Sequence, residues 1–211
     1  MVAMFFLNLL RKNKFYTKRS LFYIAKCTER RLKKVTIKIS GENNTLRIGK
    51  NCRIQNCEIR LKGRNNTILI GDHVVFKSGK IYLVGGEGQE ITIGNGTTVE
   101  GAYLLSDENA SITIGEDCML ATDILIRTGD KHSIVELETG KRVNYSESIM
   151  LGKHVWLGRS VQLLKGASLP DNTIVGAGSL VNKKFTDNYT VVAGVPSKVV
   201  KHNVNWLREL I

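Results

Sequence analysis

Aliphatic residues recur at every sixth position between residues 151 and 181 of this chain. These residues are Leu151, Leu157, Leu163, Leu169, Val175 and Val181. A period of six matches neither the turn of a helix nor the alternation of a simple strand. It is typical of a β-solenoid, in which each six-residue unit forms one flat face of a triangular coil. Three units close one coil of about 18 residues, and the aliphatic side chains point inward to form a continuous core.

The repeat extends toward the N-terminus with longer coils. The segments Gly41–Gly49 and Gly63–Gly71 are similar in sequence and are offset by 22 residues. Ile-Gly pairs then recur at Ile70, Ile93 and Ile114, at spacings of 23 and 21 residues. Because these spacings exceed three hexapeptide units, we expect the early coils to carry small bulges, rich in Asn and Gly, at their corners.

One long insertion interrupts the repeat. Ile114 and Leu151 are 37 residues apart, roughly twice the length of one coil, and the extra residues, about 127–148, are polar and charged. A long loop on a rigid scaffold is a common place for function. The chain is therefore predicted to be all-β, with a β-helix over 35–186 that carries this loop. A basic, helical arm over 1–34 precedes it, and a strand and short helix over 187–211 follow it.

The composition restricts the partners. A formal net charge of +12 predicts an anionic partner or anionic surroundings. The basic residues are scattered and show no helix-turn-helix or zinc-finger spacing, so we expect no nucleic-acid partner. Phosphorylated cofactors and acidic polysaccharides are the remaining anions. Cys52 and Cys118 occupy small inward positions of the repeat, which predicts buried thiols and a reducing, cytoplasmic location, with no metal site.

The N-terminus holds a short apolar run, 2–10, followed by basic residues. The run is too short to span a bilayer, and its charge follows it, whereas the charge of a secretory signal comes first. Two interpretations stay open. The segment is either a basic amphipathic arm that touches the inner membrane surface or a helix packed on the end of the solenoid or on a neighbouring subunit.

The four histidines are candidates for proton transfer. His73 and His154 lie at outward positions of the repeat and His202 on the predicted terminal helix, so we expect all three to be solvated surface residues. His132 lies in the inserted loop. An imidazole there can take a proton from a hydroxyl group at neutral pH, although an ordinary loop histidine would show the same spacing.

Trp156 is the second candidate. It occupies an outward position on a coil whose inward positions are already filled. A large aromatic side chain at such a position needs cover, from either a neighbouring subunit or a ligand.

Several motifs resemble those of a known family. They are the loop histidine His132, Ile59–Gly63, Ile114–Leu120, Glu138–Asn144, His154–Arg159, Gly176–Ser179 and Ala193–Val200. In this order and spacing they are similar to the hexapeptide acyltransferases of the maltose and galactoside O-acetyltransferase type. The resemblance is closer to the bacterial capsular sialic-acid (polysialic acid) O-acetyltransferases, and it covers roughly residues 35–206.

The resemblance implies a homotrimer of left-handed parallel β-helices with the active site between two subunits. His132 would be the general base that deprotonates a sugar hydroxyl, which attacks the thioester of acetyl-CoA. Trp156 would border the pantetheine arm and the acceptor. The residues implied to bind the cofactor are Trp156, Gly158, Arg159, Ala177, Lys183, Lys198 and Lys201. The family often has proline after the catalytic histidine, where this chain has Ser133, and Asp130 is a candidate to orient His132.

The predicted function is transfer of an acetyl group to a hydroxyl of a capsular or surface polysaccharide, in the cytoplasm or at the inner face of its membrane. Contact with that membrane or with capsule-assembly proteins stays open. One alternative is an acetyltransferase for a small sugar or nucleotide sugar, and another is a non-catalytic trimeric scaffold. A solenoid metal lyase of the γ-carbonic anhydrase type is disfavoured because His73, His132 and His154 are too scattered to bind zinc together.

Overall fold

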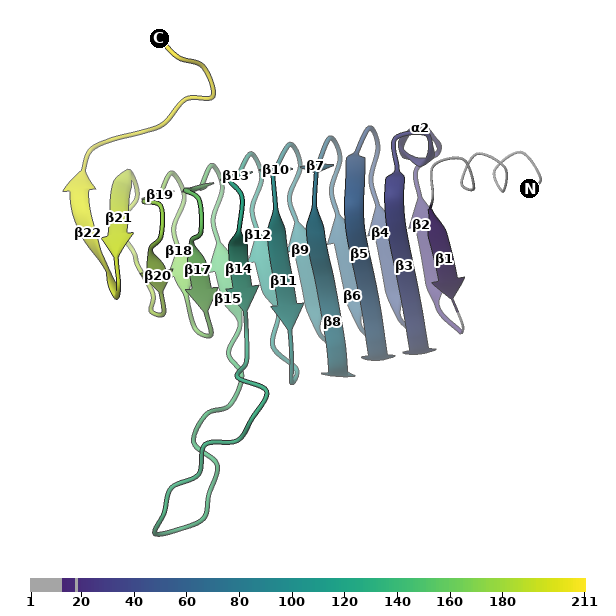
Figure 1. The fold of residues 1–211 in the computed structure, drawn as a ribbon, viewed down its shortest axis with the longest axis horizontal. Coiled ribbons are helices and arrows are strands. Elements are labelled where there is room, and N and C mark those ends of the chain that lie inside the picture. The colour runs from purple at the N-terminus through teal and green to yellow at the C-terminus, as the bar shows by residue number, and fades with distance from the viewer. Residues whose placement is uncertain (1–12, 18) are drawn as a thin grey trace.

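Three faces of parallel strands run along the molecule, because each coil contributes one strand to each face (Figure 1). The computed structural model describes residues 13–17 and 19–211. The first face contains β1 (Lys14–Thr17), β3 (Lys33–Glu42), β5 (Arg53–Arg64), β8 (Gly79–Glu87), β11 (Ala102–Ser106), β14 (Ile124–Arg127), β17 (Gln162–Leu164) and β20 (Leu180–Val181).

The other two faces are built from shorter strands. The second face contains β2 (Leu21–Ile24), β4 (Thr45–Ile48), β6 (Thr67–Ile70), β9 (Glu90–Ile93), β12 (Ile112–Ile114), β15 (Ile149–Leu151) and β18 (Ser168–Leu169). The third face begins with the first residues of β5 and continues through β7 (Val75–Phe76), β10 (Thr98–Val99), β13 (Met119–Leu120), β16 (Trp156–Leu157), β19 (Ile174–Val175), β21 (Thr190–Gly194) and β22 (Ser197–His202).

The core is a stack of aliphatic side chains, as the period of six predicted. Leu157 pairs in register with Leu120 of the preceding coil and Val175 of the following coil, and all three are buried. Each such side chain contributes roughly 1.5–3 kcal/mol by leaving water. The stack is continuous from coil to coil, and Cys52 and Cys118 lie within it as buried thiols.

The coils become shorter along the chain. Val35 pairs with Cys57, 22 residues later, whereas Leu163 pairs with Val181, 18 residues later. The extra residues lengthen the first face: β3 and β8 have 10 and 9 residues, whereas β17 has 3. Strand alternation continues along this face and buries additional aliphatic side chains. A register shift between Lys62 and Arg64, beside Gly63, also agrees with a bulge at this corner.

Asparagines form a ladder at one corner of the early coils. The Asn44 amide donates to the Gly63 carbonyl at 2.9 Å, and its oxygen accepts from the Asn66 backbone at 3.1 Å. Asn66 repeats this pattern with Gly86 and Gln89 of the next coil. These buried amides satisfy backbone groups where the chain turns.

The N-terminal region differs from the predicted helical arm. Within its described residues the chain forms β1, β2 and a helix of one turn, α2 (Lys26–Glu29), and both strands pair with the coil that follows. Residues 13–34 thus continue the solenoid toward the N-terminus. The apolar run at 2–10 lies outside the described residues. In the described part of the chain, no helix is long and apolar enough to cross a membrane.

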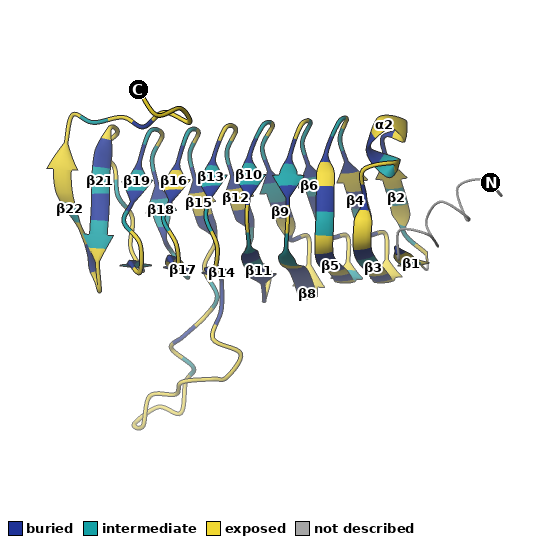
Figure 2. Cartoon of the chain, turned by 45° about the horizontal axis from the view of Figure 1, so that its top comes forward, coloured by how far each residue is buried: buried dark blue, intermediate teal, exposed yellow. Residues whose placement is uncertain are grey.

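The C-terminal helix predicted over 197–211 is also wrong. Residues 197–202 form β22, which pairs antiparallel with β21, because Val199 and Val200 favour a strand. The remaining residues are extended and run back along the solenoid (Figures 1 and 2).

The inserted loop lies where the sequence predicted it. It leaves the end of β14 and returns to β15, and it projects away from the solenoid (Figure 1). One isolated antiparallel bridge, between Val135 and Arg142, ties its two arms together.

Candidate active site

His132 lies near the root of the inserted loop with an exposed side chain. Its imidazole makes no hydrogen bond or ion pair with any residue that the structure describes, whereas its backbone carbonyl accepts a hydrogen bond of 2.8 Å from Asn144. The ring is therefore free to accept a proton from a bound molecule.

Charged side chains fix the root of this loop to the solenoid. Arg142 forms two hydrogen bonds with Glu108, of 2.6 and 2.7 Å. Lys165, which follows β17, contacts Asp130 at 2.6 Å, and this contact is the main cause of the lowered pKa of Asp130. Asp130 therefore faces Lys165 and Asn144, and no contact joins it to the His132 ring that it was suggested to orient.

Trp156 projects from β16 on the third face, between Met119 and Ile174 of the neighbouring coils. Its side chain is 36% exposed. The ring centroid lies 6.2 Å from that of Trp206, in the C-terminal segment. One edge of Trp156 is thus covered within the chain, and the rest faces solvent.

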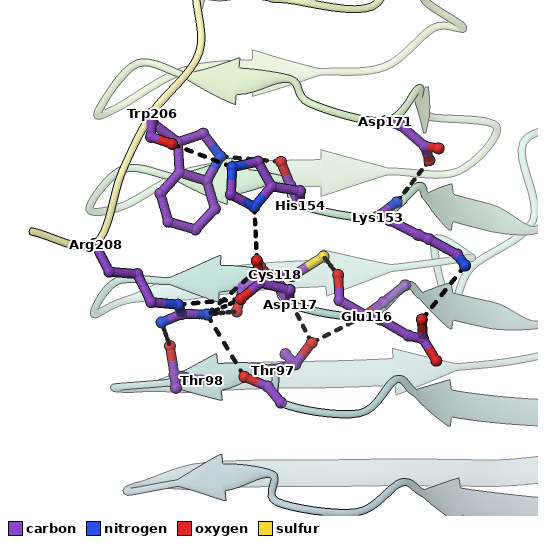
Figure 3. A network of polar contacts seen from close by, with 12 residues as sticks. Thr97, Thr98, Glu116, Asp117, Cys118, Lys153, His154, Asp171, Trp206 and Arg208 are labelled. Atoms are coloured by element: carbon purple, nitrogen blue, oxygen red, sulfur yellow. Dashed lines mark hydrogen bonds and ion pairs between the residues drawn. The ribbon is translucent and has the colours of Figure 1, made fainter.

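His154 is not the solvated surface residue that the sequence predicted. Its ring stacks on Trp206 with a centroid distance of 4.1 Å and an interplanar angle of 8° (Figure 3). Nδ1 lies 2.7 Å from a carboxylate oxygen of Asp117, and Nε2 lies 3.1 Å from the carbonyl oxygen of Trp206. The indole of Trp206 donates in return to the His154 carbonyl at 2.9 Å.

Arg208 completes this network by reaching across two coils. It donates to Asp117 at 2.8 Å and to Thr98 at 3.0 Å (Figure 3). Burial alone would raise the pKa of Asp117, but the hydrogen bonds from His154 and Arg208 outweigh it and lower that pKa. We call His154, Asp117, Trp206 and Arg208 the C-terminal latch. Sequence reasoning missed it, and its one signal was the tryptophan in the C-terminal segment.

Two backbone amides on successive coils are available as donors. The N–H of Gly158 donates to the Val175 carbonyl at 2.8 Å, so it is already used. The N–H groups of Arg159 and Ala177 have no acceptor among the described residues. A Cβ atom on Gly158 would lie 2.7 Å from the nitrogen of Ala177, so the two coils approach closely because residue 158 is glycine.

The predicted phosphate-binding lysines do not gather at one place in the chain. Lys198 and Lys201 lie exposed on β22, at the edge of the third face. Lys183 follows β20, where its ammonium lies over the ring of Phe185, and its carbonyl accepts from Ser168 of the second face.

One chain does not bring the proposed base and the proposed tryptophan together. The loop with His132 connects the first face to the second, whereas Trp156 lies on the third. The chain does bring together Trp156, His154 and Trp206. Within residues 13–17 and 19–211, no cluster of three or more His, Cys, Asp or Glu side chains is arranged to bind a metal ion.

Known proteins share both the sequence and the fold. The polysialic acid O-acetyltransferase of Neisseria meningitidis is 39% identical over 172 residues, which cover 82% of this chain and 79% of that protein. The enzyme of the same description from Escherichia coli O1:K1 is 31% identical over 136 residues, which span only 44% of its length. No protein-family model matches the chain.

The structure of the polysialic acid O-acetyltransferase OatWY superposes with a TM-score of 0.89, at 35% identity, over 94% of this chain and 92% of that one. The polySia-specific acetyltransferase NeuO gives a TM-score of 0.83 at 28% identity, over 93% of this chain and 88% of that one. Together with these relatives, the coils, their period and the inserted loop identify an acyltransferase of the left-handed β-helix class. Within that class, the chain belongs to the polysialic acid O-acetyltransferase family.

Proposed function

We propose that this protein transfers the acetyl group of acetyl-CoA to a hydroxyl of a capsular or surface polysaccharide that contains sialic acid, with His132 as the general base. The observation that carries the proposal is the 39% identity to the Neisseria meningitidis enzyme over 82% of the chain. The unpaired imidazole of His132 on an otherwise anchored loop agrees with this role.

Acetyl-CoA would supply an acyl group activated as a thioester. The imidazole of His132 would accept the proton of the sugar hydroxyl as that oxygen attacks the thioester carbon. The C–O bond would form, the C–S bond would break, and CoA would leave as the thiol after it takes up this proton. The free N–H groups of Arg159 and Ala177 can donate to a carbonyl oxygen that gains negative charge, a role that the already bonded Gly158 cannot fill. Lys198 and Lys201 are exposed and form no ion pair within the described chain, so both are free to meet phosphate groups.

The active site of this proposal lies between subunits of a homotrimer. His132 and Trp156 lie on different sides of one chain, so copies must pack side by side for the two residues to meet. Apolar side chains of the loop lack cover in the chain, including Leu137, which is 98% exposed. A neighbouring subunit would bury them.

A basic groove along the first face suits an anionic polymer. A hollow of about 480 Å³ is lined by Lys14, Lys34, Lys38 and Lys80, with Glu58 as its carboxylate. Lys80 also lines an adjoining hollow of about 500 Å³ that continues toward the C-terminal coils. Such a row of positive charges attracts a chain with one negative charge per sugar.

The decisive experiment follows release of free CoA thiol from acetyl-CoA with a panel of acceptors. We expect turnover on sialic-acid polymers, its loss in His132→Ala, and slower turnover as salt rises, because added ions screen attraction between exposed charges. Turnover on small or nucleotide sugars alone would support the alternative, an acetyltransferase for those sugars. No turnover with any acceptor, together with no thermal stabilisation by acetyl-CoA, would support the alternative of a non-catalytic scaffold.

We further propose that the enzyme works in the cytoplasm, at the inner face of the membrane where a capsule polymer is assembled. The basic residues that follow the apolar run support contact with an anionic surface. Co-flotation with vesicles that contain anionic lipid tests this, and a variant without residues 1–12 that floats equally well would contradict it.

A further inference from the structure

The side chain of Asn144 holds the inserted loop at four points. It is 4% exposed, and its Nδ2 donates to a carboxylate oxygen of Asp130 at 2.9 Å and to the His132 carbonyl at 2.8 Å. Its Oδ1 accepts from the Ile134 backbone at 2.7 Å and from Nε of Arg142 at 3.2 Å. Both amide protons and the carbonyl oxygen are thus used, as a buried amide requires.

This geometry allows one orientation of the amide. A flipped side chain would direct Oδ1 at the Asp130 carboxylate and the His132 carbonyl, and Nδ2 at two N–H donors. Three of the four contacts lie within two residues of His132 on either side or on His132 itself. Asn144 therefore binds the Asp130 side chain before the histidine, the backbone carbonyl of His132 itself, and the backbone N–H of Ile134 after it.

Two ion pairs connect this amide to the solenoid. Asp130 also forms an ion pair of 2.6 Å with Lys165, which follows β17. Arg142 forms an ion pair of 2.6 Å with Glu108, which follows β11. Asn144 is the residue that joins both anchors to the carbonyl of His132, which makes no other hydrogen bond or ion pair with the described part of the chain.

We propose that Asn144 is a positioning residue, which places the His132 imidazole for proton transfer by holding the backbone of the same residue. The inference rests on the proposed function of His132. Since the ring itself is unpaired, its location depends on that backbone, and a displacement of about 1 Å at a reacting group can lower a rate by about 10²-fold.

The test is a double-mutant cycle with Asn144→Asp and His132→Ala. The aspartate keeps the shape of the side chain but replaces both donors by an acceptor facing Asp130 and the His132 carbonyl. We expect kcat to fall by about 10²-fold with an unchanged KM for acetyl-CoA. In the His132→Ala background the same substitution should cause no further loss, because the group that it positions is gone.

Asn188→Asp provides the matched control, since Asn188 is exposed and forms no hydrogen bond within the described chain. Should Asn144→Asp fail to fold, Asn144→Ala removes the same donors without adding charge and takes its place in the cycle. Wild-type kcat in the Asn144 variant, or an equal loss in both backgrounds, would overturn the inference. Wild-type activity in His132→Ala would instead overturn the assignment of the base, which is a distinguishable result.

Discussion

At the scale of single residues, the pair of Arg142 and Glu108 sets the charge at the root of the loop. The hydrogen bonds from Arg142 and Ser146 lower the pKa of Glu108 to about 2, from an ordinary value of 4.5. Because the folded-state pKa is the lower one, the pair stabilises the root above pH 4.5, and this contribution is lost as the pH falls toward 2. Both groups are partly exposed, so solvent screens the pair and its effect on stability is small.

Replacing Arg142 should restore the ordinary titration of Glu108. In Arg142→Met we expect the midpoint for Glu108, followed by its carboxylate NMR signal, to rise from about 2 toward 4.5. Lys141→Met removes a neighbouring exposed charge that contacts no carboxylate in the described chain, and its midpoint should stay low. An unmoved midpoint in Arg142→Met would show that another group depresses the pKa.

Individual residues also show what a sequence can predict. The position of His132 in a polar insertion and the outward Trp156 followed from spacing, because both depend on the repeat. The contacts of His154 did not, because they come from Asp117, 37 residues earlier in the chain, and Trp206, 52 residues later. The contacts of Asn144 could not be predicted from the sequence either, because they depend on how the loop folds back on itself.

At the scale of elements, the repeat predicted the solenoid well and its two ends poorly. Inward aliphatic residues determine each coil locally, so the core could be derived from spacing alone. The first face is longer in the early coils because buried and exposed residues alternate there along long strands. A rule based on six-residue units does not predict such strands. The C-terminal segment lacks any repeat, and its extended path depends on the latch.

The latch should respond to the loss of Arg208. The chain has two tryptophans, and Trp206 is 4% exposed. In Arg208→Ala we expect Trp206 to become more exposed, seen as a red shift of fluorescence emission, and the melting temperature to fall by about 2–4 °C for each kcal/mol lost. Leu210→Ala, which removes a fully exposed side chain of the same segment, should change neither. Emission unchanged in Arg208→Ala would mean that the stacking on His154 holds the segment alone.

At the scale of the whole molecule, the location of the site can be tested by mixing inactive subunits. In a trimer that joins His132 of one subunit to Trp156 of the next, every mixed trimer of His132→Ala and Trp156→Ala subunits has one intact site. Random assembly of equal amounts should therefore restore about one quarter of wild-type activity. The two variants refolded separately serve as the control. A site formed within one chain would give no recovery at all.

The change in coil length separates two parts of the molecule that can vary independently. The long coils from β3 to β11 carry most of the basic groove, whereas Trp156, Arg159 and Ala177 lie on the short coils. Parallel strands are spaced about 4.8 Å apart, so the gain or loss of one long coil changes the reach of the groove by one such step. If the groove holds the polymer as proposed, the span that it holds would change in whole units while the reacting groups keep their geometry.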